Sequence, residues 1–513
     1  MSFVNNWLDK ISAEICLPGS PKAQEETYDE YSRDFDDPTE KPRLGKYWTI
    51  VTAGAGLFSD GYVNNSIGTA GTCLSILYPK EYKNSPAQGN VASIAFVGTV
   101  VGQLSFGWIV DHYSRKFGML LGTVILMLFT VLAAGSWGAH GSIYGMLAAL
   151  TAYRFFLGIG IGSEYPAGSV ACAEATMHLS KGRRNRWFVW FTNFMIDFGF
   201  VVSAFVPLVL LWIFGTHHLN AVWRLTIGLG VFPPISLFFL RLRYKEDKRF
   251  TKNNFKKTGV PYWLILKFYW RRLFVVSLIW FIYDFSSYSF GIFSSTILNG
   301  LIPDGNLYKT FGWNVVFNLF YIPGAFLGAI AADYIGPRLT LAFGVGLQGI
   351  IGFIMAARYA SLSEHIASFT VVFGIFTALG EFGPGDNIGL ICSKTSSTAI
   401  RGQYYGLAAA IGKIGAFVGT KVFPIILNHN ASAPFYISSS LCIFSAFLAL
   451  FCLPALTQDS IQEEDIRFRE YLSASGFDMS RLGETLESDM SPEMDPVDPI
   501  DYEKKSAVQT SAM

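Results

Sequence analysis

Ionisable side chains interrupt stretches of this sequence that are otherwise apolar. The acids are Asp60, Glu164, Asp197, Asp284, Glu381 and Asp386, and the bases are Arg154 and Lys413. Burying a charge in an apolar environment is costly, so each of these residues is a candidate for binding or for proton transfer. The acids outnumber the bases. A site lined by them would attract cations, but it could also accept an anion if some carboxylates bind protons, because burial disfavours their charged form.

Three polar side chains recur at intervals of four residues in one apolar stretch: Trp280, Asp284 and Tyr288. On an α-helix this spacing places them on one face across two turns. An indole N–H, a carboxylate and a phenol can together orient a polar ligand by hydrogen bonds. An aromatic belt at a membrane surface with one stray acid would give a similar pattern. However, Asp284 lies in the middle of the stretch, which favours a binding site.

A glycine-rich segment, residues 154–166, reads Arg-Phe-Phe-Leu-Gly-Ile-Gly-Ile-Gly-Ser-Glu-Tyr-Pro. In a soluble protein such glycines could form a phosphate-binding loop, but here no strand precedes them and they lie inside an apolar stretch. Small residues in a membrane helix allow close helix packing. Packing accounts for the glycines but not for Arg154, Glu164 and Tyr165, which remain candidates for function.

The elements that position these residues are predicted to be membrane-spanning α-helices. Of the 513 residues, 51% are hydrophobic and only 15% are charged, a balance typical of membrane proteins. A helix of about twenty apolar residues, rising ~1.5 Å per residue, crosses a hydrocarbon core of about 30 Å. Twelve spans are predicted, near residues 47–70, 91–111, 117–136, 144–170, 187–213, 221–240, 272–298, 311–333, 339–359, 367–391, 402–427 and 434–453.

Lysine and arginine gather in the loops that follow even-numbered spans, at residues 115–116, 181–186 and 241–257. Basic loops stay on the cytoplasmic side of a membrane, so these loops and both chain tails are expected to be cytoplasmic. The polar tails are residues 1–45 and 454–513. Their acidic segments, such as residues 463–465 and 493–501, are expected to be largely disordered because they are too polar to bury a core.

A segment that follows the second span recurs, in altered form, after the eighth. Residues 107–116 read Gly-Trp-Ile-Val-Asp-His-Tyr-Ser-Arg-Lys, and residues 333–338 read Asp-Tyr-Ile-Gly-Pro-Arg. A carboxylate at a helix end can pair with a basic loop and hold two helices together. The residues predicted to do this are Gly107, Asp111, Arg115 and Lys116 in the first copy and Asp333 and Arg338 in the second. Positive charge that merely fixes topology is the simpler explanation, but two copies at matching places favour a repeated motif.

The repeat predicts two six-helix halves that flank a central cavity, an architecture found in many secondary transporters. The halves comprise residues 46–240 and 272–453, joined by a basic loop over residues 241–271. The first copy of the repeat resembles the loop motif of the major facilitator superfamily, Gly-x-x-x-Asp-x-x-Gly-Arg-Lys. Ser114 replaces the second glycine of that motif, and in the second copy Pro337 replaces the first basic residue.

Two further segments are similar to the phosphate:proton symporter branch of this superfamily. They are Gly-x-Gly-x-Glu-Tyr-Pro at residues 160–166 and Trp-x-x-x-Asp-x-x-x-Tyr at residues 280–288. The resemblance implies that the substrate phosphate is contacted by Tyr165, Trp280, Asp284 and Tyr288. It implies that Asp60 and Glu164 are the proton-linked acids, although the phosphate carriers usually have aspartate at the second position. Lys413 matches a lysine of the branch in the eleventh span and is expected to bind substrate.

Two segments depart from the phosphate carriers. Where those have a glutamine in the fifth span, residues 192–197 read Thr-Asn-Phe-Met-Ile-Asp, so that contact is not transferred. Where they have Asn-x-Gly-Pro-Asn in the tenth span, residues 381–386 read Glu-Phe-Gly-Pro-Gly-Asp, which resembles the fungal glycerophosphoinositol permeases. Similarity to these permeases extends through residues 59–64, 266–270, 291–297 and 399–413 and covers all twelve spans.

Gly385 suggests a physical reason for the second departure. A glycine leaves room beside a phosphate-sized site for a group esterified to the phosphate, and we predict that Asp386 contacts this group. The alternative is a helix kink at Pro384 and Gly385 that has no bearing on the substrate.

The resemblance therefore implies proton-coupled uptake of glycerophosphodiesters, glycerophosphoinositol or glycerophosphocholine, by a multi-pass protein of the plasma membrane. Two alternatives stay open: inorganic phosphate:proton symport, and a nutrient receptor that binds without transport, to which only the long polar tails point. No nucleophile–base pair or metal-ligand cluster of recognised spacing appears, so we expect no enzymatic activity, metal or cofactor. The expected partners are a small anionic phosphodiester, protons and the lipid bilayer, with no nucleic acid, and the chain is expected to be a monomer.

Overall fold

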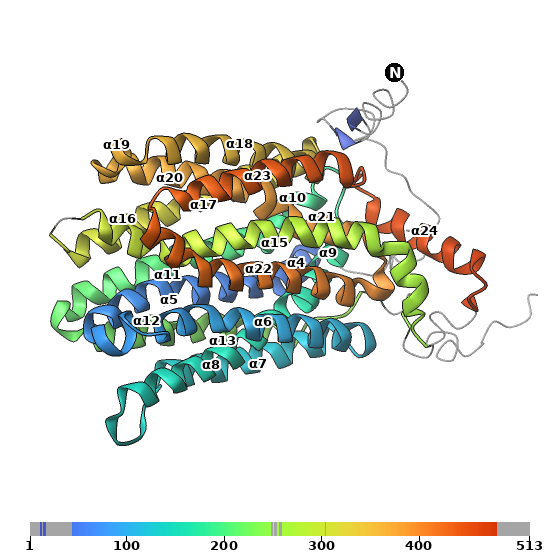
Figure 1. Ribbon diagram of the computed structural model, residues 1–513. Coiled ribbons are helices and arrows are strands. Elements are labelled where there is room, and N and C mark those ends of the chain that lie inside the picture. The colour runs from blue at the N-terminus through green and yellow to red at the C-terminus, as the bar shows by residue number, and fades with distance from the viewer. Residues whose placement is uncertain are drawn as a thin grey trace, which may run out of the picture.

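The structure is a computed structural model that describes residues 11, 12, 14–16, 44–247, 250, 254, 255, 259–302 and 304–479. Regular secondary structure in these residues is helical throughout, and the long helices run side by side (Figure 1). Among the described residues, eleven helices are long and apolar enough to cross a membrane. The expected all-helical fold is confirmed.

The helices of the first half lie between Leu44 and Arg241. They are α4 (Leu44–Gly54), η1 (Ala55–Leu57), α5 (Phe58–Leu77), η2 (Pro79–Lys83), α6 (Ala87–His112), α7 (Arg115–Ala134), η3 (Ala139–Gly141), α8 (Ile143–Ser163), η4 (Glu164–Ser169), α9 (Val170–Thr176), α10 (Arg184–Phe191), α11 (Asn193–Phe214), η5 (Thr216–His218), α12 (Leu219–Gly228), η6 (Leu229–Val231) and α13 (Phe232–Arg241). Ser114, which replaces a glycine of the loop motif, begins α7 as an N-cap by accepting a hydrogen bond from the backbone N–H of Phe117 at 3.1 Å.

The helices of the second half follow from Tyr262. They are α15 (Tyr262–Gly300), α16 (Leu307–Leu319), α17 (Tyr321–Tyr334), α18 (Pro337–Ala357), α19 (Tyr359–Ser363), α20 (Ile366–Gly380), η7 (Glu381–Gly385), α21 (Asp386–Lys394), η8 (Thr398–Ile400), α22 (Arg401–His429) and α23 (Ala433–Cys452). Gly336, with φ of 88°, turns the chain into α18, and Pro337 at the first helical position takes the place of the basic residue in the loop motif.

The predicted spans from the second to the twelfth coincide with the eleven apolar helices to within a few residues, apart from longer helix ends. The first predicted span is also helical, through α4, η1 and α5, but it is not among the eleven, since it carries polar residues such as Asp60, Asn64 and Asn65. The expected basic loop over residues 241–271 is shorter than predicted. Arg241 ends α13, and α15 begins at Tyr262 because a helix can continue beyond its apolar stretch.

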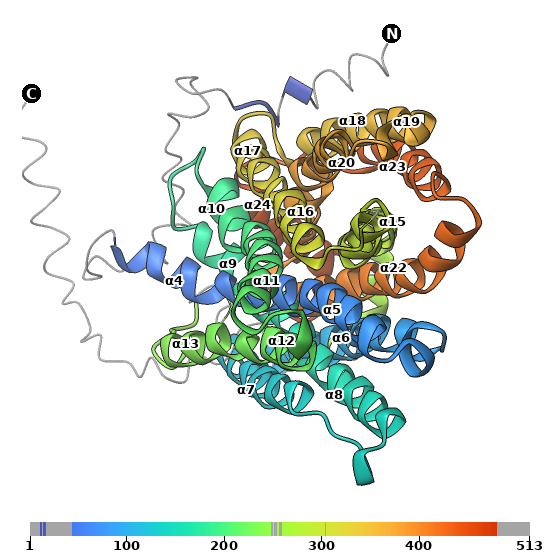
Figure 2. The same cartoon turned by 90° about the vertical axis from the view of Figure 1, so that its left-hand side faces the viewer.

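The two halves meet along α5, α6, α15 and α22, which lie together in the view along the helices (Figure 2). Glycines allow this close approach. A Cβ atom at Gly406 of α22 would lie 2.4 Å from the carbonyl oxygen of Gln103 of α6. A Cβ atom at Gly68 of α5 would lie 2.3 Å from the carbonyl oxygen of Ile292 of α15. Both helix pairs therefore require a residue without a side chain at the crossing.

One end of the bundle, which we call the tail end, carries residues 14–16 and α24 (Ser460–Ala474) (Figure 1). The prediction of disorder at residues 463–465 is wrong, because these residues lie in α24. Ile461, Phe468 and Leu472 recur at helical spacing and bury an apolar stripe between the charged residues. Residues 493–501 lie outside the described part of the chain.

Candidate functional site

A buried cluster of Asp60, Tyr165, Tyr288 and Lys413 joins the two halves, and we call it the lysine cluster. Its members come from α5, η4, α15 and α22 respectively. The Tyr288 hydroxyl donates to Asp60 Oδ2 at 3.0 Å, and the Tyr165 hydroxyl donates to the same oxygen. The Lys413 ammonium donates to the Tyr288 hydroxyl and lies 3.5 Å from Asp60 Oδ2. One cation and two phenols thus converge on one carboxylate.

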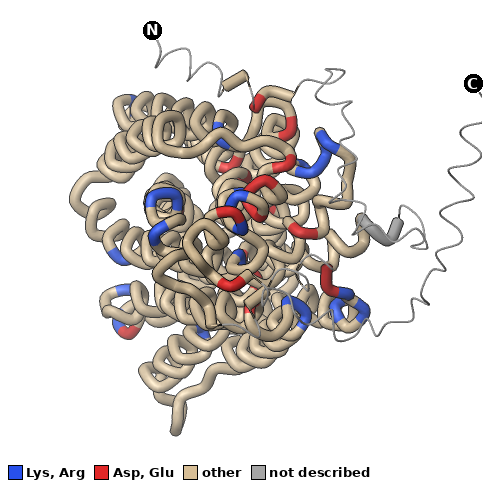
Figure 3. The backbone as a smooth tube through the Cα atoms, turned by 90° about the vertical axis from the view of Figure 1, so that its right-hand side faces the viewer, with Lys and Arg blue, Asp and Glu red and all other residues tan. Residues whose placement is uncertain are grey.

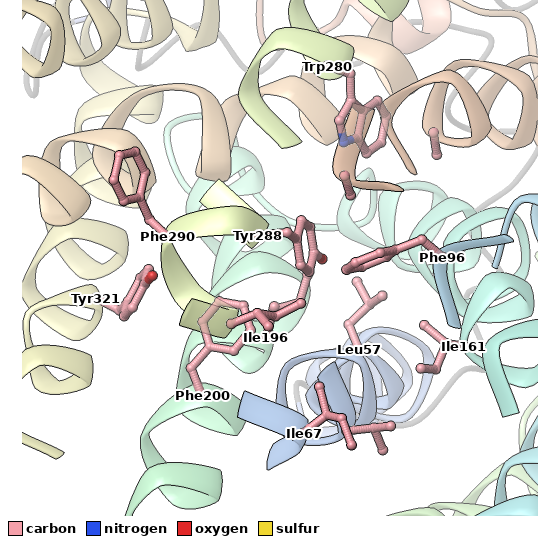
Figure 4. Close-up of a cluster of buried hydrophobic side chains, with 14 of the residues drawn as sticks. Leu57, Ile67, Phe96, Ile161, Ile196, Phe200, Trp280, Tyr288, Phe290 and Tyr321 are labelled. Carbon is pink, nitrogen blue, oxygen red and sulfur yellow. The ribbon is translucent and has the colours of Figure 1, made fainter. Parts of the chain in front are cut away.

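Asp284 and Trp280 extend this cluster along the same face of α15, as their spacing predicts. Asp284 Oδ2 lies 3.4 Å from Lys413 Nζ, so the one ammonium serves two carboxylates. Trp280 packs against α22 at Gly412, where a Cβ atom would lie 2.5 Å from the indole ring. Figure 4 shows Trp280 and Tyr288 among buried apolar side chains, which exclude water and strengthen the charge interactions.

A second polar group, which we call the acidic group, consists of Asn193, Asp197, Tyr283, Glu381 and Asp386. The Asn193 amide lies 3.1 Å from Glu381 Oε2, 3.0 Å from Asp386 Oδ1 and 3.3 Å from Asp197 Oδ2. The Tyr283 hydroxyl donates to Glu381 Oε1 at 2.6 Å. Three carboxylates from α11, η7 and α21 therefore share one amide donor.

Residues from both sets line one cavity, which we call the central cavity. Trp280, Asp284, Tyr165 and Tyr288 line it from the lysine cluster, whereas Asp60 and Lys413 lie behind these aromatic side chains. All members of the acidic group line the cavity as well. They are Asn193, Asp197, Tyr283, Glu381 and Asp386. The cavity is thus polar both on the side of the lysine cluster and on the side of the acidic group.

Gly385 lines the same cavity, beside the acidic group. A Cβ atom at this position would lie 2.0 Å from Glu381 Oε2 and 2.6 Å from the Tyr283 hydroxyl. The glycine therefore leaves room for the hydrogen-bonded pair of Glu381 and Tyr283. Asp386, the residue predicted to contact the alcohol of a phosphodiester, follows directly and also lines the cavity.

Two ionisable residues of the glycine-rich segment lie away from the central cavity. Glu164 forms a two-pronged ion pair with Arg241, with both N–O distances at 2.6 Å, and both side chains are buried. Arg154 donates to the carbonyl of Val91 at 2.8 Å. Neither residue shares the pocket with the substrate-facing residues predicted from the sequence.

The first copy of the loop motif lies at the tail end and connects the halves. Asp111 accepts hydrogen bonds from the backbone N–H groups of Gly402 at 2.9 Å and Gln403 at 2.7 Å, at the start of α22. Arg115 lies 2.5 Å from Asp111, and Gly107 faces the Gly402 carbonyl, which a Cβ atom would approach to 2.9 Å. Lys116 donates to the carbonyl of Leu242 at 2.7 Å. A first-half carboxylate thus caps a second-half helix.

The second copy of the motif makes the reciprocal contact. Asp333 accepts from the backbone N–H of Asn185 at 3.0 Å and pairs with Arg186 at 2.5 Å, at the start of α10. Arg338 does not pair with Asp333; it pairs with Glu14 at 2.9 Å, because Asp333 faces the first half. Figure 3 looks onto this end, where basic and acidic residues gather over the middle of the bundle.

Several partners in these sites were not predicted from the sequence. Asn64, which donates to Asp60, and Asn193, which contacts Asp197, each lie four residues from the acid, a spacing that could have identified them. Tyr283 was hidden by its apolar neighbours. Arg241 was assigned to a basic loop, and its position at the end of an apolar span is the only local indication of burial.

The sequence matches the model of the family described as "Sugar (and other) transporter" over residues 48–259 and 251–468. The chain belongs to this transporter family, within the major facilitator superfamily. This result accounts for the two helical halves and for the loop motif in each. The transporter family is consistent with the expectation from the sequence that the chain is not an enzyme.

This transporter is similar to two permeases of Candida albicans. It is 57% identical over 493 residues to the major glycerophosphoinositol permease GIT3, covering 93% of this chain and 92% of that one. It is 56% identical over 495 residues to the glycerophosphocholine permease GIT4, covering 94% and 92%. Among solved structures, the transporter resembles the proton:xylose symporter XylE bound to 6-bromo-6-deoxy-D-glucose, with a TM-score of 0.67 at 14% identity, covering 83% of this chain and 99% of that one.

Proposed function

We propose that this transporter takes up glycerophosphodiesters across the plasma membrane together with protons. The names of its relatives support this substrate class, since they include a glycerophosphoinositol permease and a glycerophosphocholine permease. The observation that carries the proposal is the position of Lys413, one ammonium behind a polar cavity wall formed by Tyr165, Trp280 and Tyr288.

A phosphodiester bears one negative charge, which the Lys413 ammonium can offset. The Trp280 N–H and the hydroxyls of Tyr165 and Tyr288 can donate to the phosphoryl oxygens. In the structure both hydroxyls donate to Asp60. A proton on Asp60 would weaken these bonds and release the donors and the ammonium toward the substrate. Proton binding and substrate binding would then favour each other.

Glu164 is proposed as the second proton-linked acid. Its partner is Arg241 rather than a cavity residue, so a proton on Glu164 would disrupt an ion pair inside the first half. We propose that this step accompanies the rearrangement of the helices, while Asp60 responds to the substrate. The two acids must then be tested separately, because Asp60 belongs to the lysine cluster and Glu164 does not.

We further propose twelve spans, with α4, η1 and α5 as the first, in a monomer whose tail end faces the cytoplasm. The basic residues near the loop motifs support this orientation. The halves are proposed as the helices from α4 to α13 and from α15 to α23, and the loop-motif residues are proposed to hold them together at the tail end. Single cysteines introduced at Asn84 and at Lys245, both of which are exposed, test the orientation in intact cells with a membrane-impermeant reagent. Labelling at position 84 alone is expected, and labelling at position 245 contradicts the arrangement.

The function is tested by uptake of labelled glycerophosphoinositol, glycerophosphocholine and inorganic phosphate into cells that lack their own carriers. Accumulation of a diester above its external concentration, with uptake that decreases as external pH rises, is the expected result. Accumulation of phosphate alone would assign the chain to phosphate symport instead. Saturable binding without accumulation would assign it to a receptor.

A further inference from the structure

The acidic group has no cation of its own. Asp197, Glu381 and Asp386 are all buried, and among the described residues that line the central cavity there is no lysine or arginine. The Lys413 ammonium lies beside two other carboxylates, Asp60 and Asp284. The acidic side of the cavity therefore combines several carboxylates with only an amide and a phenol as donors.

A second observation indicates that this side of the cavity can hold a ligand. Asp197 is 0% exposed and lines the cavity, yet its Oδ1 atom has no hydrogen-bond partner. A buried carboxylate oxygen without a donor or a counter-charge is costly. Among the described residues, no group of three or more His, Cys, Asp and Glu side chains is arranged to hold a metal ion.

We propose that Asp197, Glu381 and Asp386 form the subsite for the alcohol of the phosphodiester, and that this subsite selects an alcohol that carries a cationic ammonium group. The inference rests on the proposed function and extends it to the substrate class. The central cavity has a cation behind one side and uncompensated carboxylates on the other. This arrangement matches a zwitterion whose phosphate faces Lys413 and whose ammonium faces the acidic group.

The apolar lining near the acidic group fits the same ligand. A quaternary ammonium has no N–H to donate, so it is stabilised by carboxylates at a distance and by aromatic faces. Phe188, Phe200 and Tyr283 line the cavity together with Asp197. A neutral polyol would offer hydroxyl donors to the carboxylates, but only a cationic group can offset a negative charge on them. The geometry thus favours glycerophosphocholine over glycerophosphoinositol in this chain.

Competition on the unaltered protein tests the inference first. Uptake of a labelled diester is measured against increasing glycerophosphocholine and against glycerophosphoglycerol, whose alcohol is neutral. Glycerophosphocholine is expected to compete about tenfold better, as one uncompensated charge contact is worth at least ~1.4 kcal/mol. Equal or weaker competition by glycerophosphocholine overturns the inference. If the unaltered protein accumulates no diester, the proposed function itself fails, which is a separate result.

Charge-neutral variants provide the second test. Asp197→Asn and Glu381→Gln keep the side-chain shape, and Asp304→Asn is the matched control because Asp304 pairs with Lys309 in an exposed loop. Both cavity variants are expected to lose more glycerophosphocholine uptake than glycerophosphoglycerol uptake, so that the ratio of the two decreases about tenfold, while the control keeps the ratio of the unaltered protein. The amount of each variant at the cell surface, measured beside uptake, shows that the variants fold. Equal losses of the two diesters, or no loss of either, overturn the inference.

Discussion

Asp60 Oδ2 and Lys413 Nζ lie 3.5 Å apart, although one belongs to α5 in the first half and the other to α22 in the second. Tyr288 bridges them, because its hydroxyl accepts from Lys413 and donates to Asp60. The pair therefore links the two halves through charge. Under the proposed function, an anionic substrate that draws the ammonium toward itself would loosen this link, and binding would then favour a relative movement of the halves.

The link predicts the outcome of Asp60→Asn. Neutral asparagine can no longer exchange a proton, so we expect accumulation against a gradient to be lost and the dependence of uptake on external pH to become flat. Downhill exchange of substrate is expected to continue. Uptake and exchange are measured between pH 5 and pH 8 for Asp60→Asn and, in parallel, for Glu164→Gln. If both variants accumulated substrate as the unaltered protein does, the proposed coupling would be refuted.

Lys413→Met should weaken the binding of every anionic substrate to the same extent, because it removes the one cation of the lysine cluster. Truncating one partner of a buried charge pair costs about 2–5 kcal/mol, so we expect a decrease in apparent affinity of roughly thirtyfold or more. Lys421→Met is the matched control, since Lys421 lies on the same helix but contacts Asn90 instead. A Lys413→Met variant with normal affinity for the diesters and for phosphate would exclude this role.

Gly385→Asn tests the space beside the acidic group. The new side chain must displace Glu381 and Tyr283, which a Cβ atom would approach to 2.0 and 2.6 Å. Overfilling a packed site costs about 1–3 kcal/mol, so diester uptake is expected to decrease by about tenfold, whereas any phosphate uptake should be spared. Uptake of both substrates is compared in one strain. Equal decreases for diester and phosphate would separate Gly385 from substrate selection.

The buried pair of Glu164 and Arg241 should determine stability within the first half. Arg241→Gln leaves an unpaired buried carboxylate and is expected to destabilise the protein by about 3–5 kcal/mol. The double variant Glu164→Gln, Arg241→Gln should recover part of this loss, because neither charge is then left alone. Thermal unfolding of the purified proteins in detergent measures the difference. A double variant less stable than Arg241→Gln would contradict the pairing.

A pH-dependent contact lies at the tail end, between Asp459 and the pair Lys181 and Arg184, each at 2.7 Å. Burial alone would raise the pKa of Asp459, but the two cations outweigh it and hold the pKa below its ordinary value. Because the pKa is lowered in the folded protein, the ionised Asp459 stabilises the fold at pH values above the ordinary carboxyl pKa. This stabilisation is lost as the pH falls through the lowered pKa of the folded state. Asp459→Asn should therefore reduce thermal stability at pH 7, by on the order of 1 kcal/mol, with the difference disappearing below about pH 4. A difference that grows on acidification would contradict this sign.

The apolar spans could be predicted from the sequence because hydropathy is a local property. The start of α15 and the helix α24 could not, because each depends on packing. Tyr269 of α15, for example, is buried against Phe468 of α24, with ring centres 5.3 Å apart. Local charge predicted a basic loop at Arg241, but in the fold Arg241 is buried and pairs with Glu164, 77 positions away.

The candidate site divides in the same way. The face of Trp280, Asp284 and Tyr288 follows from helical spacing alone, whereas the meeting of Asp60 with Lys413 depends on how the halves pack. The acidic group is harder still, since Asp197 and Glu381 are far apart in the chain and share only Asn193. Composition indicated surplus acid, but only the fold shows that four of the six acids, Asp197, Asp284, Glu381 and Asp386, face one cavity.

The reciprocal helix caps at the tail end place backbone amides where hydrogen exchange can report transport. The amide hydrogens of Gly402 and Gln403 are bonded to Asp111, and that of Asn185 is bonded to Asp333, only while the two halves are closed there. In the proposed transport cycle the halves separate there, and these amides would then meet water and take up deuterium. Their exchange rate, followed by mass spectrometry, would count opening events without any label on the substrate, and a transported diester should accelerate it.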